Sequence, residues 1–274
     1  MFRDCLENVR QKTPLIHNIT NYVTVNDCAN VLLACGGSPI MADDEAEVEA
    51  ITSICGGLNL NIGTLNTRTI EAMFLAGHKA NALDHPIILD PVGAGASSLR
   101  TETAKRLVKD LNLTVIRGNI SEIKTLATGS GTTKGVDADL ADQVTEENLD
   151  QMIAFAKAYA KETGAIIAIT GAIDLIADAK HAYVIRNGVA MLSKITGSGC
   201  MLSAMTAAYI TANQENPLEA VATSVCAMGL CGEQAFAKMQ QNQVGSGSFR
   251  TYLIDAIDLL DGETLEAGKR YEMR

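Results

Sequence analysis

The chain has 274 residues, of which 47% are hydrophobic and 20% charged, and it contains no tryptophan. This length and apolar content are sufficient for a globular protein with a sizeable core. The net charge of −10 argues against a nucleic-acid partner, because phosphate backbones require clustered lysine and arginine.

The sequence carries no sign of export or membrane insertion. The N-terminal segment MFRDCLENVR lacks the apolar stretch of a signal peptide, and no apolar run approaches the ~20 residues that span a bilayer. The cysteines are odd in number, 7 in all, and lack metal-site spacing. Reduced thiols in a cytoplasmic enzyme fit best, and only Cys200 lies in a suggestive context.

Short apolar runs alternate with helical patterns along most of the chain. The predicted strands are 15–19, 58–62, 87–89, 113–116 and 165–169, and the predicted helices include 67–79, 99–110 and 146–161. Continuous apolar strands separated by helices are typical of a parallel sheet covered on both faces.

The second half of the chain changes character. Residues 173–185 read as a β-hairpin, and the chain after Gly199 is strongly helical through Met239. We expect a loop at 245–248 and a last helix over 252–260. No linker or repeat is visible, so one domain over 1–274 is predicted. Ligands of such sheets bind beyond the carboxyl ends of the strands, where the polar residues lie.

The segment Thr196-Gly197-Ser198-Gly199-Cys200 precedes a long helix. Glycines let successive N–H groups point to one spot, where the helix dipole favours a phosphate or a developing oxyanion. The same field is expected to lower the pKa of the Cys200 thiol. A tight turn and a packed cysteine are the plainer interpretations of this segment.

Two further segments combine acidic residues with turn signals. Asp90 ends a strand before PVGAG and can face a cation, although it could simply order the turn. In Arg117-Gly118-Asn119, followed by Glu122, a capping box explains Asn119 and Glu122 well. The functional alternative has Asp90 and Glu122 facing one Mg²⁺ through water, with Arg117 near a phosphate.

Thr170 ends another strand, where its hydroxyl could meet a nucleotide. The segment HNITN at 17–21 includes Asn21, and Met41 lies nearby in sequence; together they suit a small heteroaromatic ligand. His17 has no spaced partners of a metal site and is expected to make structural hydrogen bonds.

In this order, the segments resemble the ribokinase-like superfamily, and in detail its hydroxyethylthiazole kinase family. The resemblance spans residues 17–249 and is carried by HNITN, SPIMA, LNIGT, ILDPVGAGA, IRGNISE, AITG, TGSGC, ENPL and GSGSF. It implies a three-layer αβα fold with a mostly parallel sheet and no separate lid domain. It also implies transfer of the γ-phosphoryl group of ATP, with Mg²⁺, to the primary alcohol of hydroxyethylthiazole in thiamine salvage.

The resemblance also assigns roles by motif. Arg117 and Thr170 would contact ATP, and Asp90 and Glu122 would organise the metal. Gly197, Ser198 and Gly199 would form the anion hole, with Cys200 beside it. Asn21, Met41 and Gly197 would border the thiazole. The family is a homotrimer with active sites between subunits, so Asn21 and Met41 could meet the nucleotide half of a neighbouring chain.

One position departs from the wider superfamily, where an aspartate acting as base usually stands at Cys200. A loose transition state needs little base help, so we expect Cys200 to be an auxiliary base or orienter and the anion hole to contribute more. Three alternatives stay open: another small-metabolite kinase of the superfamily, a repair dehydratase for nicotinamide cofactors, and a non-catalytic nucleotide or thiazole sensor. Cys200, HNITN and the acidic pair argue against them.

Overall fold

The computed structural model describes residues 1–129, 133–134, 137–138 and 143–274. Within them, a 9-stranded sheet has the strand order β11-β10-β9-β8-β5-β4-β3-β1-β2, and β6 pairs with β7 in a separate ribbon. The strands are β1 (Leu15–Ile19), β2 (Ser38–Met41), β3 (Gly57–Asn61), β4 (Ile87–Asp90), β5 (Val115–Asn119), β6 (Thr133–Lys134), β7 (Asp137–Ala138), β8 (Ile166–Thr170), β9 (Asp174–Ala177), β10 (Ala182–Ile185) and β11 (Tyr271–Met273).

The sheet is parallel from β2 to β8 and antiparallel beyond it. All five predicted strands are present, and the hairpin expected in 173–185 is β9 with β10. The strand β11 was not predicted; it brings the end of the described chain back to the antiparallel edge. The predicted α/β class with a mostly parallel sheet is confirmed.

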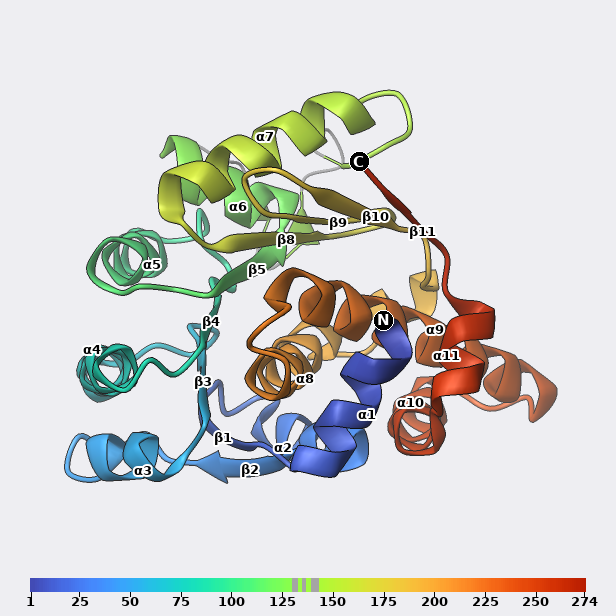
Figure 1. Cartoon of the computed structure of the whole chain (residues 1–274), viewed down its shortest axis with the longest axis horizontal. Helices are drawn as coiled ribbons and strands as arrows, with labels where there is room; N and C mark the ends of the chain where they lie inside the picture. Colours follow the sequence, from blue (N-terminus) through green and yellow to red (C-terminus); the bar gives the residue numbers. More distant parts are fainter. Residues whose placement is uncertain (130–132, 135–136, 139–142) are drawn as a thin grey trace.

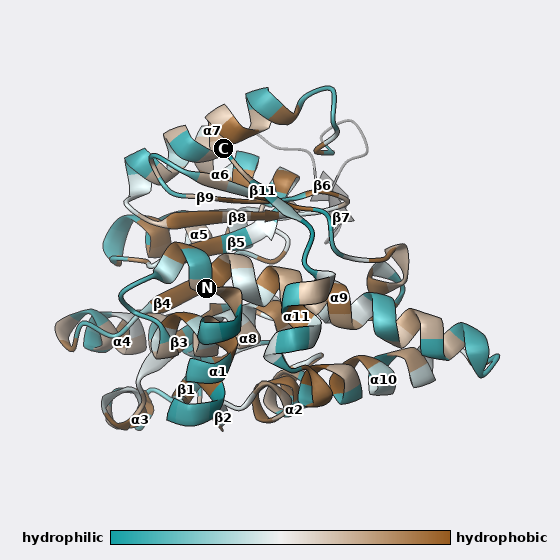
Figure 2. Ribbon diagram, turned by 45° about the vertical axis from the view of Figure 1, so that its right-hand side comes forward, coloured by the Kyte–Doolittle hydropathy of each residue, from teal (hydrophilic) through white to brown (hydrophobic). Residues whose placement is uncertain are grey.

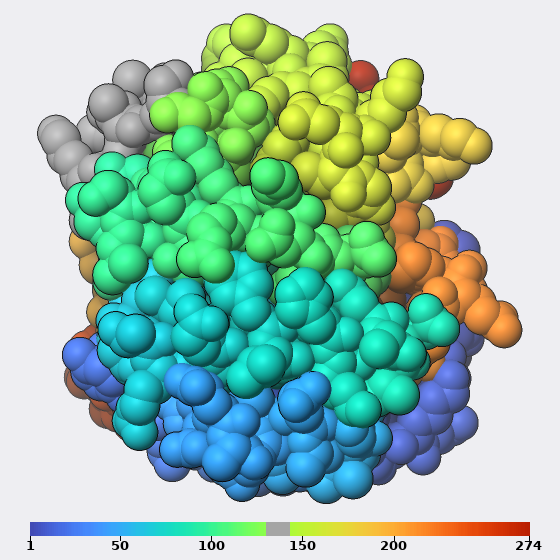
Figure 3. Space-filling model, turned by 90° about the vertical axis from the view of Figure 1, so that its left-hand side faces the viewer, coloured from blue at the N-terminus to red at the C-terminus, as the bar shows by residue number. Residues whose placement is uncertain are grey.

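Helices cover both faces of this sheet (Figure 1). One layer holds α3 (Val48–Ile54), α4 (Thr67–Ala82), α5 (Ser98–Asp110), α6 (Ile120–Thr128) and α7 (Leu149–Thr163). The other holds α1 (Phe2–Lys12), α2 (Val25–Cys35), α8 (Ser198–Ala212), α9 (Pro217–Gln241), α10 (Ser246–Leu259) and α11 (Gly262–Gly268). Figure 3 looks onto the first layer, which the middle of the chain builds.

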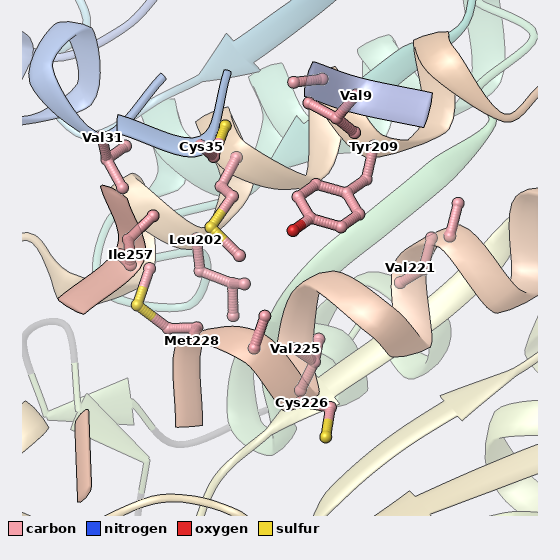
Figure 4. Packing of buried hydrophobic residues seen from close by; sticks show 14 of the residues in the cluster. Val9, Val31, Cys35, Leu202, Tyr209, Val221, Val225, Cys226, Met228 and Ile257 are labelled. Atoms are coloured by element: carbon pink, nitrogen blue, oxygen red, sulfur yellow. The ribbon is translucent and has the colours of Figure 1, made fainter. Parts of the chain in front are cut away.

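Each helical layer packs against the sheet through its own apolar cluster. The cluster under α8 and α9 is the one in Figure 4, where Leu202 and Tyr209 of α8 meet Val225 of α9 and Cys35 of α2. In Figure 2 the ribbon of the central strands is mostly hydrophobic, while the helices carry both hydrophobic and hydrophilic stretches. Burial of this cluster, worth roughly 25 cal/mol per Å², holds α8 across the sheet beside the strand ends.

Two sequence-based expectations need correction. No segment long and apolar enough to span a membrane was expected, but α9 meets that requirement by length and composition. Of its most apolar stretch, 78% is buried inside the protein, as in a core helix. The segment expected as a loop at 245–248 instead begins α10, which starts at Ser246. Phe249, Leu253 and Ile257 are buried at four-residue spacing, and their packing overrides the low helix propensity of the Ser-Gly pattern.

Candidate active site

The order in which the chain adds strands to the sheet reverses beside β1, and this creates a place for a ligand. Strand β1 lies between β2 and β3, and the chain leaves β1 into α2 but leaves β3 into α4, on opposite faces of the sheet (Figure 1). In open α/β sheets, ligands bind at such a switch point, outside the carboxyl ends of the strands. Asn21 follows β1 there, and Asn61 is the last residue of β3.

Asp90 is fully buried at the carboxyl end of β4. Its Oδ2 accepts hydrogen bonds from Asn61 Nδ2 at 2.9 Å and Ser203 Oγ at 2.8 Å, and it pairs with Arg117 Nη1 at 3.4 Å. Its Oδ1 has no hydrogen-bond partner among the described residues. Burial raises the pKa of Asp90, while Arg117, Ser203 and Asn61 oppose that rise. One carboxylate oxygen is thus fixed in place and the other is left for a ligand.

Arg117 joins the neighbouring strands at this edge. Its Nη2 donates to Thr170 Oγ1 at 2.6 Å, and its side chain is only 11% exposed. The guanidinium also lies against α8, because a Cβ on Gly199 would be 2.7 Å from Nη1 and 2.8 Å from Nη2. The two residues predicted to contact a nucleotide, Arg117 and Thr170, are therefore together, next to Asp90.

Glu122 makes the capping box that its spacing predicted. Its Oε2 accepts from the backbone N–H of Asn119 at 2.8 Å, and Asn119 Oδ1 accepts from the N–H of Glu122 at 2.9 Å. The alternative role of Glu122, near a Mg²⁺ ion with Asp90, is compatible with this capping box. Glu122 Oε1 also accepts from the N–H of Gly93, in the turn after Asp90, at 2.8 Å. Burial, then the nearby Asp90, raises the pKa of Glu122 to about 7.

The first turn of α8 presents uncapped backbone donors. The first intrahelical bond at this end runs from the N–H of Met201 to the carbonyl of Gly197, so the N–H groups of Ser198, Gly199 and Cys200 precede it. Gly197 has φ +83°, and a Cβ there would collide with Thr24 Cγ2. Glycine is therefore required at 197 by both conformation and space. These N–H groups form the site that we call the anion hole.

Cys200 is half-buried, and its sulfur accepts a hydrogen bond from Asn21 Nδ2 at 3.2 Å. The expected lowering of its pKa is wrong. Burial raises the pKa of the thiol, and the negative charge of Asp90 raises it further, against the hydrogen bonds of Asn61, Thr24 and Asn21. Desolvation disfavours the charged thiolate, and a nearby carboxylate repels it, so both raise the pKa.

Met41 and His17 lie apart from this cluster. Met41 ends β2, which is separated from β4 by β1 and β3, a distance of roughly 14 Å at 4.8 Å per strand. It packs against the cluster under α8. His17 is buried between Thr52 Oγ1 and the carbonyl of Ala42, at 2.9 and 2.8 Å, and burial lowers its pKa. Its expected structural role is confirmed.

A hollow of about 380 Å³ lies next to Asn21. Its lining includes Tyr22, Gly63, Leu65 and Leu99. A Cβ on Gly63 would be 2.9 Å from Asn21 Cβ, so this hollow and the buried cluster share a wall. Arg100 also lines the hollow, and its guanidinium donates to the carbonyls of Val92 and Gly63.

Magnesium is the cation that this donor set fits. The described residues contain no group of three or more His, Cys, Asp or Glu side chains able to cage a metal. Mg²⁺ needs no such cage, since it keeps several waters and binds one or two carboxylates together with substrate phosphates. The unpartnered Oδ1 of Asp90, with Glu122 behind the adjoining turn, meets that requirement.

Sequence reasoning missed four residues of this network: Asn61, Ser203, Thr24 and Asp174. The first two bond Asp90, and Thr24 donates to Asn21 Oδ1 from both its N–H and its hydroxyl, at 3.1 and 3.0 Å. A signal for Asn61 was present. Asn59 and Asn61 alternate within an apolar strand, which places both on one buried face where amides must be hydrogen-bonded.

We expect Asp174 to make the stability of the folded protein depend on pH. It is buried at the start of β9, accepts from the N–H of Gly171 at 2.8 Å, and its pKa is raised to about 7 by burial, against Gly171 and Arg117. Because the folded state favours the protonated acid, stability should fall as pH rises from the ordinary aspartate range through 7. For this shift we expect a loss of about 2–3 kcal/mol between pH 5 and 8, reduced in Asp174→Asn.

Urea unfolding at several pH values measures this loss. Glu122 contributes with the same sign, so Asp174→Asn should flatten the slope without abolishing it. The control is Asp178→Asn in the turn of the hairpin. The pKa of Asp178 is lowered, so it is ionised in both states above pH 5 and should not affect the slope. An unchanged slope in Asp174→Asn would contradict the prediction.

Comparison with known proteins gives one consistent result. The model of the hydroxyethylthiazole kinase family matches residues 6–263. A protein of Clostridium acetobutylicum named hydroxyethylthiazole kinase is 64% identical over 99% of this chain and 99% of its own length. A protein of the same name from Clostridium tetani is 47% identical over 97% of this chain and 96% of its own.

Solved structures agree with this. The hydroxyethylthiazole kinase protein of Pyrococcus horikoshii superposes with a TM-score of 0.89 at 31% identity, covering 100% of this chain and 98% of that one. The pyridoxal kinase of Staphylococcus aureus, at 19% identity and a TM-score of 0.57, covers 78% of this chain and 84% of its own, and shares the fold alone. The three-layer ribokinase-like architecture is therefore common to both.

Proposed function

The chain belongs to the hydroxyethylthiazole kinase family, and from that premise we propose which of its residues carry the reaction and with which metal. It phosphorylates the hydroxyl group of hydroxyethylthiazole in thiamine salvage, with ATP as co-substrate. The alcohol oxygen forms a bond to the γ-phosphorus while the bond from that phosphorus to the bridging oxygen of ADP breaks, and the alcohol releases one proton.

One observation carries the assignment of the site. The unpartnered oxygen of Asp90, the Arg117–Thr170 pair and the uncapped start of α8 all lie at one edge of the sheet. We assign the phosphate groups of ATP to Arg117 and Thr170, and the transferred phosphoryl group to the N–H groups of the anion hole. Preorganised donors in a buried site stabilise charge on phosphoryl oxygens without reorganisation.

We assign Mg²⁺ to Asp90, with Glu122 acting through water. When bound, the ion would neutralise the negative charge of the ATP phosphate oxygens as the phosphoryl group is transferred. Asp90 would hold it through Oδ1, since its Oδ2 already accepts from Asn61 and Ser203. Glu122 would fix the Gly93 turn and add negative charge near the ion.

The acceptor alcohol belongs on the Asn21 side. Asn21 bonds Cys200 and lies against Gly63, which lines the hollow, and Gly197 begins the turn that carries Cys200. A thiazole ring beside Asn21 would direct its hydroxyethyl arm toward the anion hole. Met41 is remote from Asp90 in the same chain, whereas Asn21 bonds its own chain's Cys200. From the family resemblance we propose a homotrimer in which Met41 borders the thiazole at an interface between chains; sedimentation of the purified protein tests the trimer.

Cys200 is proposed to orient the alcohol and, at most, to assist removal of its proton. The raised pKa of the thiol makes it a poor base at neutral pH. Cys200→Ala should therefore cost kcat only roughly 10-fold, since positioning and charge neutralisation dominate phosphoryl transfer. Cys200→Asp should keep activity, because Asn21 can donate to the new carboxylate.

Steady-state kinetics of both variants check this ranking. Gly199→Ala, which alters the anion hole directly, is the comparison. If Cys200→Ala loses as much kcat as Gly199→Ala, the thiol contributes at least as much to the rate as the anion hole does. A folded but inactive Cys200→Asp enzyme would show that a carboxylate cannot serve there.

The reaction is tested by incubating the purified protein with Mg·ATP and a panel of alcohols and detecting phosphorylated products by mass spectrometry. The panel holds hydroxyethylthiazole, hydroxymethylpyrimidine, pyridoxal and ribose. Thiazole phosphate alone, dependent on Mg²⁺, is the expected result. A different phosphorylated product would contradict the assignment of thiazole as the substrate. No product from a folded, ATP-binding protein would contradict the assignment of kinase activity. We place the enzyme in the cytoplasm, in agreement with the free state of all seven cysteines.

A further inference from the structure

Asn61 lies between the two halves of the site, and its amide is used at both ends. Its Nδ2 donates to Asp90 Oδ2 at 2.9 Å. Its Oδ1 accepts from Asn21 Nδ2 and from the N–H of Gly63, each at 2.9 Å. The side chain is 1% exposed, so water does not replace these partners.

The orientation of this amide is dictated by its neighbours. An ionised Asp90 can only accept, and the N–H of Gly63 can only donate, so Asn61 must turn its nitrogen to Asp90 and its oxygen to Gly63. Asn21 must then donate to Asn61, which leaves Asn21 Oδ1 to accept from Thr24. Donors therefore run in one direction, from Thr24 through Asn21 and Asn61 to the carboxylate.

This chain of hydrogen bonds connects parts of the site that bind different substrates. Asn21 also donates to Cys200 Sγ, at the acceptor side. Asp90 is held from the other side by Ser203 of α8 and Arg117 of β5. We propose that Asn61 is a positioning residue that couples the acceptor side, Asn21 with Cys200, to the carboxylate of Asp90. This inference depends on the proposed roles of Asp90 and Asn21.

The coupling has a simple geometric consequence. If the amide of Asn61 is removed, Asp90 Oδ2 keeps only Ser203 and Arg117, so the direction of Oδ1 is less well fixed. At the same time Asn21 loses its acceptor and can turn away from Cys200. Substitution of Asn61 thus disturbs the residues proposed to bind both substrates, whereas removal of the Ser203 hydroxyl disturbs only Asp90.

The test compares Asn61→Leu with Asn59→Leu, which is a matched control. Asn59 lies two residues away on the same face of β3, is fully buried, and donates to Asn18 at 2.9 Å. Asn61→Leu should lower kcat about 10–100-fold, as for partners that orient a ligating carboxylate, and raise the KM for thiazole. Asn59→Leu should change neither greatly, and Ser203→Ala should lower kcat with the thiazole KM unchanged.

A double-mutant cycle keeps the test valid if Asn61→Leu fails to fold. Asn21→Ala removes a donor to Asn61, Ser203→Ala removes the hydroxyl donor to Asp90, and both leave Asn61 itself intact. The double variant should lose more kcat/KM than the product of the single losses, because Asp90 then depends on an Asn61 that is itself loosened. Losses that multiply, or an Asn61→Leu enzyme that matches Asn59→Leu, would overturn the coupling.

Asp90→Asn is assayed in parallel to separate this inference from the assignment of the site. If Asp90→Asn is inactive and Asn61→Leu matches its control, only the role of Asn61 falls. If Asp90→Asn keeps wild-type activity, the assignment of Asp90 falls, and the coupling falls with it. Melting temperatures by circular dichroism accompany each variant, so a loss of fold is not counted as a loss of positioning.

Discussion

The Gly199→Ala enzyme is expected to lose about 10²–10³-fold in kcat, while its melting temperature stays close to that of the wild type. The added Cβ would lie 2.7 Å from Arg117 Nη1 and 2.8 Å from Nη2. The far end of an arginine side chain can move aside at small cost in stability. That small shift changes how the guanidinium meets Asp90 and Thr170 without separating the buried charges, and the methyl group narrows the space where phosphoryl oxygens would meet the N–H groups of α8.

The control for this substitution is Gly247→Ala. Gly247 occupies the second position of α10 in the pattern Gly-Ser-Gly-Ser, as Gly199 does in the Gly-Ser-Gly-Cys of α8. A Cβ at Gly247 would meet no heavy atom within 4 Å among the described residues. Activity should be unchanged there, and stability equal or slightly higher, since alanine is the better helix former. A Gly199→Ala enzyme of normal kcat would contradict the role given to the anion hole.

The strands of the parallel sheet were predictable because each buried strand is a short apolar run in the sequence. The runs around Leu58, Ile87 and Ile166 are apolar, bounded by polar residues, and each became a strand of the parallel sheet. The start of α10 was not predictable in the same way. Its Ser-Gly-Ser residues favour a loop locally, and only the burial of Phe249 against α2 and α9, a long-range contact, explains the helix.

The residues expected to do chemistry were largely found together because each ends a strand or begins a helix. Asp90, Arg117 and Thr170 lie on adjacent strands. They are close together because of the strand order, which cannot be read from the sequence. Their supporting residues were missed. Asn61 lies in the segment LNIGT, to which no role was assigned, and Ser203 lies in an apolar helix outside the quoted segments. Burial explains the wrong pKa expectation for Cys200, because desolvation depends on packing rather than on position in a helix.

Asp90→Asn is the substitution with the largest expected effect, a loss of about 10³-fold or more in Mg²⁺-dependent activity. The amide is nearly the same size as the carboxylate, and its oxygen can take the place of Oδ2 and accept from Asn61 and Ser203. Its nitrogen then takes the place of Oδ1, the atom without a partner among the described residues. The hydrogen bonds that hold the residue therefore survive, so the fold should too.

What changes is the atom turned toward the substrates. A neutral amide nitrogen cannot bind a cation, and it leaves Arg117 without its nearby negative charge. The measurements are kcat over a range of Mg²⁺ concentrations and the rise in melting temperature that Mg·ADP produces. Asp110→Asn, at the exposed end of α5, is the control and should behave as the wild type. A folded Asp90→Asn enzyme that kept its Mg²⁺-dependent rate within about 10-fold would place the metal elsewhere, because loss of a direct carboxylate ligand removes several kcal/mol of transition-state stabilisation.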